Sequence, residues 1–198
     1  MKTILTPRRA AAALGALALA TSGVAFAQMA PMGAMAHEHT KMVGGAPMYP
    51  SRNIIQNAVN SKDHTTLVAA VKAAGLVDTL QAPGPFTVFA PTNSAFAKLP
   101  AGTVNSLLEP ANKDKLTAVL GYHVVAGRLT AADLLAKVKA GGGRATLSTV
   151  QGGPLTVTVA GGRLVLTDAK GRVSHVTIGD VLQSNGVIHV VDTVLLPG

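Results

Sequence analysis

The chain has 198 residues, 48% of which are hydrophobic, and this is enough apolar sequence for the core of one globular domain. Because the sequence contains no cysteine, disulfide frameworks, thiol chemistry and cysteine-based metal sites are excluded. The formal net charge is +8, but the basic residues are scattered and form no run with aromatic residues, which argues against nucleic-acid binding.

Residues 1–27 have the parts of a secretory signal peptide, so we expect an exported, soluble mature protein that begins at Gln28. The basic region consists of Lys2, Arg8 and Arg9. The apolar run covers residues 10–20, and the cleavage site is Ala25-Phe26-Ala27. An uncleaved anchor is the alternative. No later stretch of about 20 apolar residues follows, so we expect no stable membrane span after the signal is removed.

Residues 28–48 are rich in methionine and histidine, and Gly and Pro interrupt any hydrophobic period. We therefore expect a flexible linker, followed by a folded domain at residues 49–198. Thioether and imidazole groups also suit copper, so this tail is a candidate copper site, with a plain solvated linker as the alternative. The candidate ligands are Met29, Met32, Met35, His37, His39 and Met42. We expect no other cofactor.

The first half of the domain has the hydrophobic period of amphipathic helices. Apolar residues at helical spacing predict helices over residues 54–59, 67–74, 103–108 and 111–120. Asp63 is expected to cap the second of these helices. Thr130-Ala-Ala-Asp133 is expected to form a capping box for a further helix that ends near Lys139.

The phenylalanines of the segment between Phe86 and Pro100 are expected to anchor the core. Its first residues are β-branched and aromatic, which predicts a strand that Pro91 ends, and the polar residues that follow are suited to cap a short helix. The phenylalanines are Phe86, Phe89 and Phe96, and the polar residues are Thr92, Asn93 and Ser94.

From Arg144 onwards the hydrophobic period changes to two, which predicts strands over residues 146–150, 155–159, 163–167, 172–178 and 187–191. Turn-forming pairs such as Gly161-Gly162 and Asn185-Gly186 separate them. Because helices come early and strands late, the sequence predicts the α+β class with a largely antiparallel sheet.

Three segments of the chain resemble the signatures of the fasciclin-like domain family. Phe86-Thr-Val-Phe-Ala-Pro-Thr-Asn-Ser-Ala-Phe resembles the first signature, and Ser184-Asn-Gly-Val-Ile-His-Val-Val-Asp-Thr-Val-Leu-Leu-Pro resembles the second. Tyr122-His123, between them, matches the tyrosine–histidine pair of the family. The resemblance implies a fasciclin-like β-sandwich or wedge of mainly antiparallel strands with a layer of helices.

The Tyr122-His123 pair is the first candidate binding site. In a strand over residues 122–125 the two side chains would point to opposite faces, so that one could be buried and the other presented. The resemblance implies that the pair and its apolar neighbours take part in adhesive recognition; these neighbours include Val124, Val125 and Leu129. A buried pair with hydrogen-bonded polar atoms is the structural alternative.

The second signature supplies the other candidate site residues, namely Asn185, Gly186, His189 and Asp192. The resemblance implies that His189 and Asp192 form a polar clasp with Thr92 and Asn93 of the first signature. Phe89 and Phe96 are the core residues of that first signature. A catalytic His–Asp pair is the alternative, but no nucleophile motif accompanies it.

Enzyme motifs for nucleotide binding, serine hydrolysis or zinc proteolysis are absent from the sequence. We therefore expect a non-catalytic adhesion or binding module, secreted, periplasmic or on the cell surface. Its expected partner is an extracellular or envelope protein or a polysaccharide. The alternative function is a periplasmic copper-binding protein that uses the Met/His-rich tail.

Overall fold

The computed structural model describes residues 40–198, which form an α+β domain as the sequence predicts. Most helices precede most strands along the chain. The helices are α1 (Ile54–Ala58), η1 (Lys62–His64), α2 (Thr65–Ala74), α3 (Val77–Gln81), α4 (Asn93–Ala97), α5 (Thr103–Leu108), η2 (Pro110–Asn112), α6 (Lys113–Tyr122) and α7 (Ala131–Ala140). The strands are β1 (Lys41–Val43), β2 (Ala46–Met48), β3 (Phe86–Pro91), β4 (Val124–Ala126), β5 (Arg144–Ser148), β6 (Pro154–Ala160), β7 (Arg163–Thr167), β8 (Val173–Gln183) and β9 (Gly186–Val191).

The main sheet has seven strands in the order β4-β3-β9-β8-β7-β6-β5. Every neighbouring pair is antiparallel except β3 and β9, which run parallel and carry the first and second signature segments. The long strand β8 pairs with β7 through its first residues, Val173–His175, and with β9 from Val176 to its end, and register shifts bend it between Val176 and Val181. Because Val125 also bridges to Thr149, the two ends of the sheet approach each other and the sheet forms a wedge.

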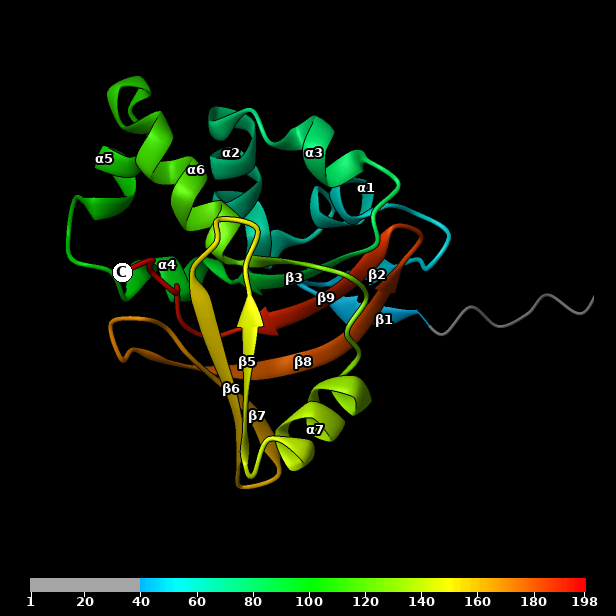
Figure 1. Ribbon diagram of the computed structural model, residues 1–198. Coiled ribbons are helices and arrows are strands. Elements are labelled where there is room, and N and C mark those ends of the chain that lie inside the picture. Colours follow the sequence, from blue (N-terminus) through cyan, green and yellow to red (C-terminus); the bar gives the residue numbers. More distant parts are fainter. Residues whose placement is uncertain (1–39) are drawn as a thin grey trace, which may run out of the picture. The chain divides into compact units, whose positions relative to one another are not determined.

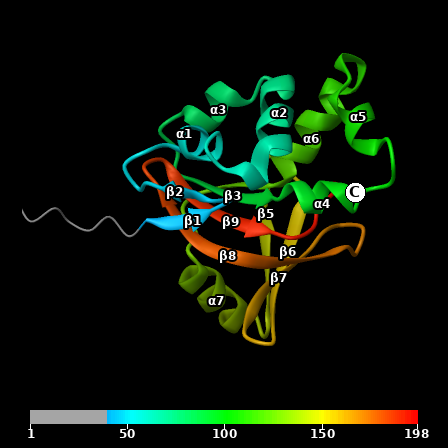
Figure 2. The same ribbon diagram turned by 180° about the vertical axis from the view of Figure 1, so that it is seen from behind.

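The helices lie in two places relative to this sheet. Helices α1 to α6 cover the face formed by β3 and β9, whereas α7 lies on the other side, beside β5, β6 and β7 (Figures 1 and 2). No helix within residues 40–198 has the length and apolar character that a membrane crossing requires.

Two apolar clusters form the core, one on each face of the central strands. Val88, Ala90, Ile188 and Val190 of β3 and β9 pack against the helical layer. Phe89 and Val191 point the opposite way, into the interior of the wedge, where they meet residues of β5 to β8 and α7. This alternation is the period of two expected for strands that are buried on both faces.

Residues 41–48 differ from the predicted linker, because they form the antiparallel hairpin β1–β2. Val43, Ala46 and Met48 are buried in the cluster beneath the helices. The prediction that the fold begins near Tyr49 is therefore wrong, and the folded unit includes Lys41. The predicted signal peptide and the linker residues up to His39 lie outside the described residues.

The first signature folds largely as its sequence predicts. Phe89 and Phe96 are buried, but Phe86 is only partly buried. Pro91 is the last residue of β3 rather than the first residue beyond it. Thr92 caps α4, since its side-chain oxygen accepts a hydrogen bond from the Ala95 N–H at 3.3 Å.

The structure differs from two local predictions, a helix cap and a hairpin turn. Asp63 does not cap α2; the amide oxygen of Asn93 instead accepts from the Thr66 N–H at 3.0 Å. Asn185-Gly186 is not the central pair of the β8–β9 turn, because Gly186 already pairs with Gln183 as the first residue of β9. The capping box of Thr130 and Asp133 and the strands from Arg144 onwards are confirmed, with shifts at their ends.

Candidate functional site

Tyr122 and His123 lie at the end of α6, not in a strand. Tyr122 is the last residue of the helix, His123 is its C-cap, and strand β4 begins only at Val124. Both side chains are buried, with exposed fractions of 0% and 2%. The prediction that one of them is presented on an opposite face is therefore wrong, because the helix end turns both inward.

The apolar neighbours of the pair are not an exposed surface either. Val124 and Val125 of β4 are buried. Leu129 is partly buried and packs against the apolar cluster inside the wedge. The five residues predicted to contact a partner thus face the protein interior, which agrees with the alternative of a buried pair.

The polar atoms of the buried pair are satisfied by the backbone. The Tyr122 hydroxyl donates to the Pro154 carbonyl at 2.5 Å and accepts from the Ala169 N–H at 3.0 Å. His123 Nε2 accepts from the Leu195 N–H at 3.0 Å, so Nδ1 carries the proton and donates to the Val119 carbonyl at 2.8 Å. Burial lowers the pKa of His123 to about 4, although the bond to Val119 opposes this shift. The ring is neutral at physiological pH and joins α6 to the C-terminal segment.

Asn185 is a structural residue that joins three segments. Its side-chain oxygen accepts from the Ile54 N–H at 3.1 Å, at the start of α1. Its amide nitrogen donates to the carbonyls of Leu80 and Ala82, at 2.8 and 2.9 Å, at the end of α3. Gly186 next to it lies so close to β3 that an added Cβ would be 2.1 Å from the Phe86 carbonyl oxygen. Asn185 is one of the two residues of the β8–β9 turn, and the Asn-Gly pair also serves long-range packing.

His189 stacks on Phe89 across the β3–β9 pair and does not contact Asp192. Its Nδ1 accepts from the Asp180 N–H at 3.3 Å, and its Nε2 donates to the Leu129 carbonyl at 2.8 Å. Burial lowers the pKa of His189, while the bond to Leu129 opposes the shift. Because both ring nitrogens are engaged with the backbone, His189 has no free nitrogen for proton transfer.

Asp192 instead joins the ends of β8 and β9 at the surface. It accepts from the His175 N–H at 2.9 Å, and its carboxylate lies 3.4 Å from the His175 ring and 3.7 Å from Lys98. Partial burial alone would raise the pKa of Asp192, but the hydrogen bonds from His175 and Thr193 and the charge of Lys98 together lower it. The pair His189–Asp192 predicted as an alternative catalytic site is not formed.

The predicted polar clasp between the two signatures is likewise not formed. Within the described residues, no hydrogen bond joins the side chain of Thr92 or Asn93 to that of His189 or Asp192. The signatures are joined instead by the β3–β9 ladder and by the Thr92 N–H, which donates to the Val191 carbonyl at 3.3 Å. The side chain of Asn93 instead forms hydrogen bonds with Thr65 and Thr66 at the start of α2 and with the Lys62 carbonyl in η1.

Five of the six candidate copper ligands lie outside the described residues, namely Met29, Met32, Met35, His37 and His39. Met42 is on β1 with its side chain 59% exposed. Among residues 40–198, no three His, Asp or Glu side chains are grouped so that they could hold a metal ion. Copper binding by the tail stays a prediction.

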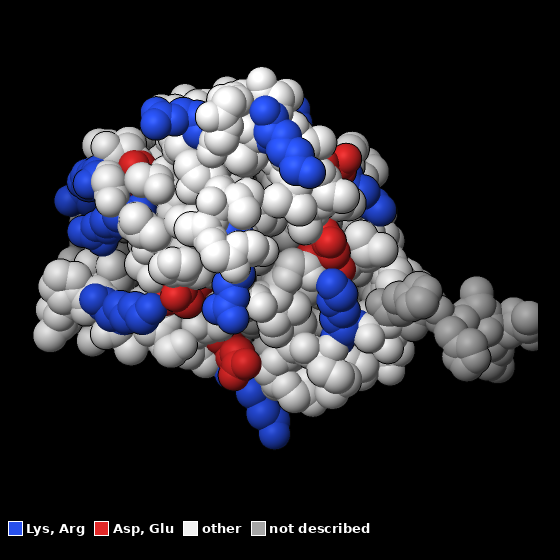
Figure 3. All heavy atoms as spheres, turned by 90° about the horizontal axis from the view of Figure 1, so that it is seen from below, with Lys and Arg blue, Asp and Glu red and all other residues white. Residues whose placement is uncertain are grey.

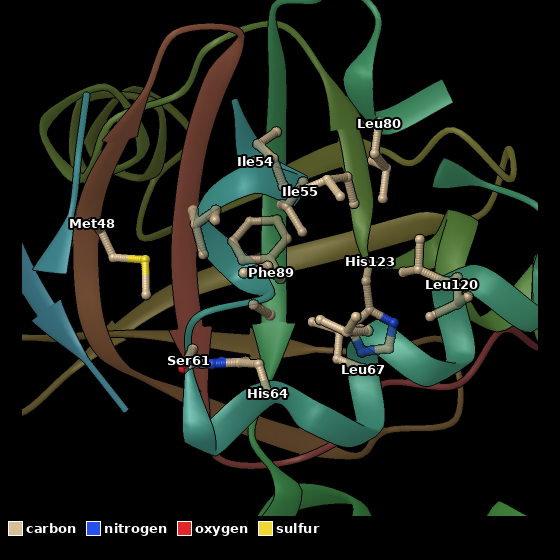
Figure 4. A pocket seen from close by; sticks show the side chains of 16 residues that line it. Met48, Ile54, Ile55, Ser61, His64, Leu67, Leu80, Phe89, Leu120 and His123 are labelled. Carbon is tan, nitrogen blue, oxygen red and sulfur yellow. Dashed lines mark hydrogen bonds between the residues drawn. The ribbon is translucent and has the colours of Figure 1, made fainter. Parts of the chain in front are cut away.

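An apolar pocket that the sequence did not indicate lies between the helical layer and the central strands. It is formed by α1, η1, α2 and α3 on one side and by β3 and β9 on the other (Figure 4). Its cavity volume is about 40 Å³, and the empty space is about 600 Å³ when its open mouth is included. The polar side chains in its lining are Ser61, His64 and His123.

The charged residues do not mark a binding site on the face seen in Figure 3. Lys and Arg outnumber Asp and Glu there, but they lie at separate places around the face. This distribution agrees with the scattered basic residues of the sequence and does not indicate a polyanion groove.

The comparisons with known proteins identify one family. The fasciclin domain model matches residues 62–197. Protein sll1483 of Synechocystis is 46% identical over 186 residues, which cover 93% of both chains. Immunogenic protein MPB70 of Mycobacterium bovis is 36% identical over 203 residues, covering 98% of this chain and 96% of that protein.

A solved structure shows the same fold. It is that of a FAS1 domain pair from the insect cell adhesion molecule Fasciclin I. The match covers 75% of this chain and 52% of the chain in that structure. The TM-score is 0.66 with 22% sequence identity, so this match speaks for the fold alone.

Proposed function

Because the chain belongs to the fasciclin domain family, we propose that it is an exported, non-catalytic module that binds a protein or polysaccharide at the cell surface or in the matrix. Members of this family are generally adhesion proteins rather than enzymes. A non-catalytic role is supported by His123 and His189, whose ring nitrogens are all bonded to backbone groups, so that neither ring is free for proton transfer.

The contact surface must differ from the residues that the resemblance implied, because these are buried. We place it on the loop between β5 and β6, residues 149–153. Val150 in this loop has its side chain 54% exposed. An exposed apolar side chain on a rigid loop can contact a partner at a low cost in conformational entropy.

Tyr122 and the backbone on either side of the buried pair hold this loop in place. The Val150 N–H donates to the Val124 carbonyl at 2.7 Å, and the Gln151 N–H donates to the Gly121 carbonyl at 3.3 Å. The Tyr122 hydroxyl donates to the Pro154 carbonyl at the start of β6. This set of bonds carries the proposal: Tyr122 and its neighbours act by positioning the loop and not by touching the partner.

The test compares two valines of similar exposure. Val150→Asp should lower binding about tenfold or more, because it places a charge in the centre of the contact. Val173→Asp is the matched control, since Val173 is 47% exposed at the start of β8, and it should bind as the unchanged protein does. Binding is measured on immobilised envelope proteins and, in a separate arm, on immobilised cell-wall polysaccharide, and melting temperatures verify folding.

Two results would contradict the proposal. Equal binding by the Val150 and Val173 variants would remove the loop from the contact. Absence of binding by the unchanged protein in both arms would remove the adhesive function itself. Tyr122→Phe should give an intermediate loss of binding, because the loop loses one anchor but keeps its exposed valine.

A further inference from the structure

The apolar pocket beneath α1 and α2 contains one polar atom without a partner. His64 lines the pocket, its side chain is buried, and its Nε2 makes no hydrogen bond within the described part of the chain. Nearly every buried polar atom in a folded protein has a hydrogen-bond partner, so an exception indicates a missing partner. The atom is therefore a candidate contact for a ligand.

The other polar groups of the pocket are already occupied. His123 uses both ring nitrogens for backbone groups, so it presents only its ring to the pocket. Ser61 Oγ lies 2.8 Å from His64 Nδ1, and Figure 4 shows the two side chains beside each other. A ligand thus meets apolar walls and a single hydrogen-bonding atom.

The pocket opens between α1 and α2, where the lining residues Ala58 and Val68 are partly exposed. Deeper residues such as Ile54, Leu67 and Ile188 are buried and apolar. Charged side chains are absent from the lining. An ionic head group would therefore be desolvated without a counter-charge, which excludes carboxylates and phosphates as the bound group.

We propose that this pocket binds an apolar molecule that carries one hydroxyl group, such as a chain alcohol, with the hydroxyl on His64 Nε2. A hydroxyl fits both tautomers of the ring. If Ser61 donates to Nδ1, Nε2 carries the proton and donates to the hydroxyl oxygen; if Nδ1 donates to Ser61, Nε2 accepts the hydroxyl proton. This site is independent of the adhesive loop.

Burial is consistent with a neutral hydrogen-bonding role for His64. Desolvation lowers the pKa of His64, and the Ala90 carbonyl and the charge of Asp63 oppose this shift. The Ala90 carbonyl does not have the geometry of a hydrogen bond to Nε2, which stays without a partner. The ring therefore stays neutral at physiological pH and offers a hydrogen bond rather than a charge.

The first experiment measures the displacement of the fluorescent apolar probe N-phenyl-1-naphthylamine from the full-length protein. The competitors are 1-octanol and 1-fluorooctane, which have similar size but differ in hydrogen bonding. One hydrogen bond predicts that octanol displaces the probe at a free concentration about three- to tenfold lower. In His64→Leu this difference should vanish while the probe still binds.

The second experiment blocks the mouth of the pocket. Val68→Trp should fill the opening between α1 and α2 and abolish binding of the probe and of octanol. Ala73→Trp is the matched control, because Ala73 lies on the same helix but is exposed and outside the pocket; it should bind as the unchanged protein does.

A third measurement needs no variant. In nitrogen NMR spectra of the imidazole rings, added octanol should shift the Nε2 signal of His64 and leave the ring signals of His189 in place. Equal displacement by octanol and fluorooctane, unchanged binding in Val68→Trp, or an unmoved His64 signal would each overturn the proposal.

Discussion

Phe89 and His189 stack on each other across the parallel strands β3 and β9, with ring centroids 5.6 Å apart and ring planes inclined by 25°. The two residues are register partners, so each signature segment contributes one ring. Both side chains are completely buried. The stack therefore joins the two signatures inside the wedge, where the sequence had suggested a clasp of polar side chains.

Replacing Phe89 by alanine should destabilise the domain strongly. The change removes a fully buried aromatic side chain and its contact with His189, so we expect a loss of about 3–5 kcal/mol in the free energy of unfolding. Urea unfolding measures this loss. The control is Val159→Ala on β6, where the side chain is 39% exposed and the expected loss is below about 1 kcal/mol. A loss in Phe89→Ala no larger than in the control would show that the stack is not central to the core.

Acidification should destabilise the domain through its buried histidines. Burial lowers the pKa of His64, His123 and His189 from 6.5, to about 4 in the case of His123. Between these values the unfolded chain binds protons that the folded chain does not, so stability falls as pH falls from about 6.5 to about 4. His123 alone should account for about 3 kcal/mol of this loss. Urea unfolding at a series of pH values measures it.

Two variants test whether His123 causes this pH dependence of stability. His123→Leu should flatten the stability curve between about pH 6.5 and 4, whatever it does to stability at neutral pH. His175→Gln serves as the control, because the His175 side chain is half-exposed beside Asp192, and it should leave most of the slope in place. An unchanged slope in the His123 variant would contradict the role of burial at this residue.

Asn185→Ala should be far more destabilising than its position in a turn indicates. The change leaves the Ile54 N–H and the carbonyls of Leu80 and Ala82 without their partner. We expect a loss of about 3 kcal/mol, against about 0.5 kcal/mol for Asn60→Ala, whose amide bonds the Gln56 carbonyl at the surface. Thermal and urea unfolding compare the two, and similar losses would mean that the three-way contact is not significant.

Truncation should reveal where the folded unit begins. A protein that lacks residues 28–48 loses the burial of Val43, Ala46 and Met48, so its free energy of unfolding should fall by about 3 kcal/mol or more. A protein that lacks only residues 28–39 keeps the β1–β2 hairpin and should melt near the temperature of the mature protein. Equal melting temperatures for both truncations would contradict the packing of the hairpin.

The shorter truncation also tests the copper prediction. If Met29, Met32, Met35, His37 and His39 bind Cu(I), removal of residues 28–39 should abolish binding, and His37→Ala or His39→Ala should weaken it. Calorimetry under reducing conditions measures the binding. Met42→Leu tests the sixth candidate ligand, which lies on β1 and is kept in the truncated protein. Equal binding by the truncated protein would leave the tail as a plain linker.

The sequence alone was sufficient for the features that local chemistry determines. The alternation of apolar residues predicted β5 to β9, the Thr130–Asp133 box predicted the start of α7, and Thr92 was identified as a helix cap. Phe89 and Phe96 were identified as core residues. These features depend on a residue and its neighbours within one or two turns of chain.

Tertiary structure decided the partners of the polar residues, because these partners are far away in sequence. Asn93 caps α2 and not its own helix region, and Asn185 bonds backbone groups more than 100 residues away. His123 was placed in a strand by its β-branched neighbours, but α6 continues through Tyr122 and turns both side chains inward. Side-chain periodicity gives the face of a residue only after the element is known. The unpartnered His64 belongs to the same class, because a missing partner can be recognised only when every neighbour in space is known.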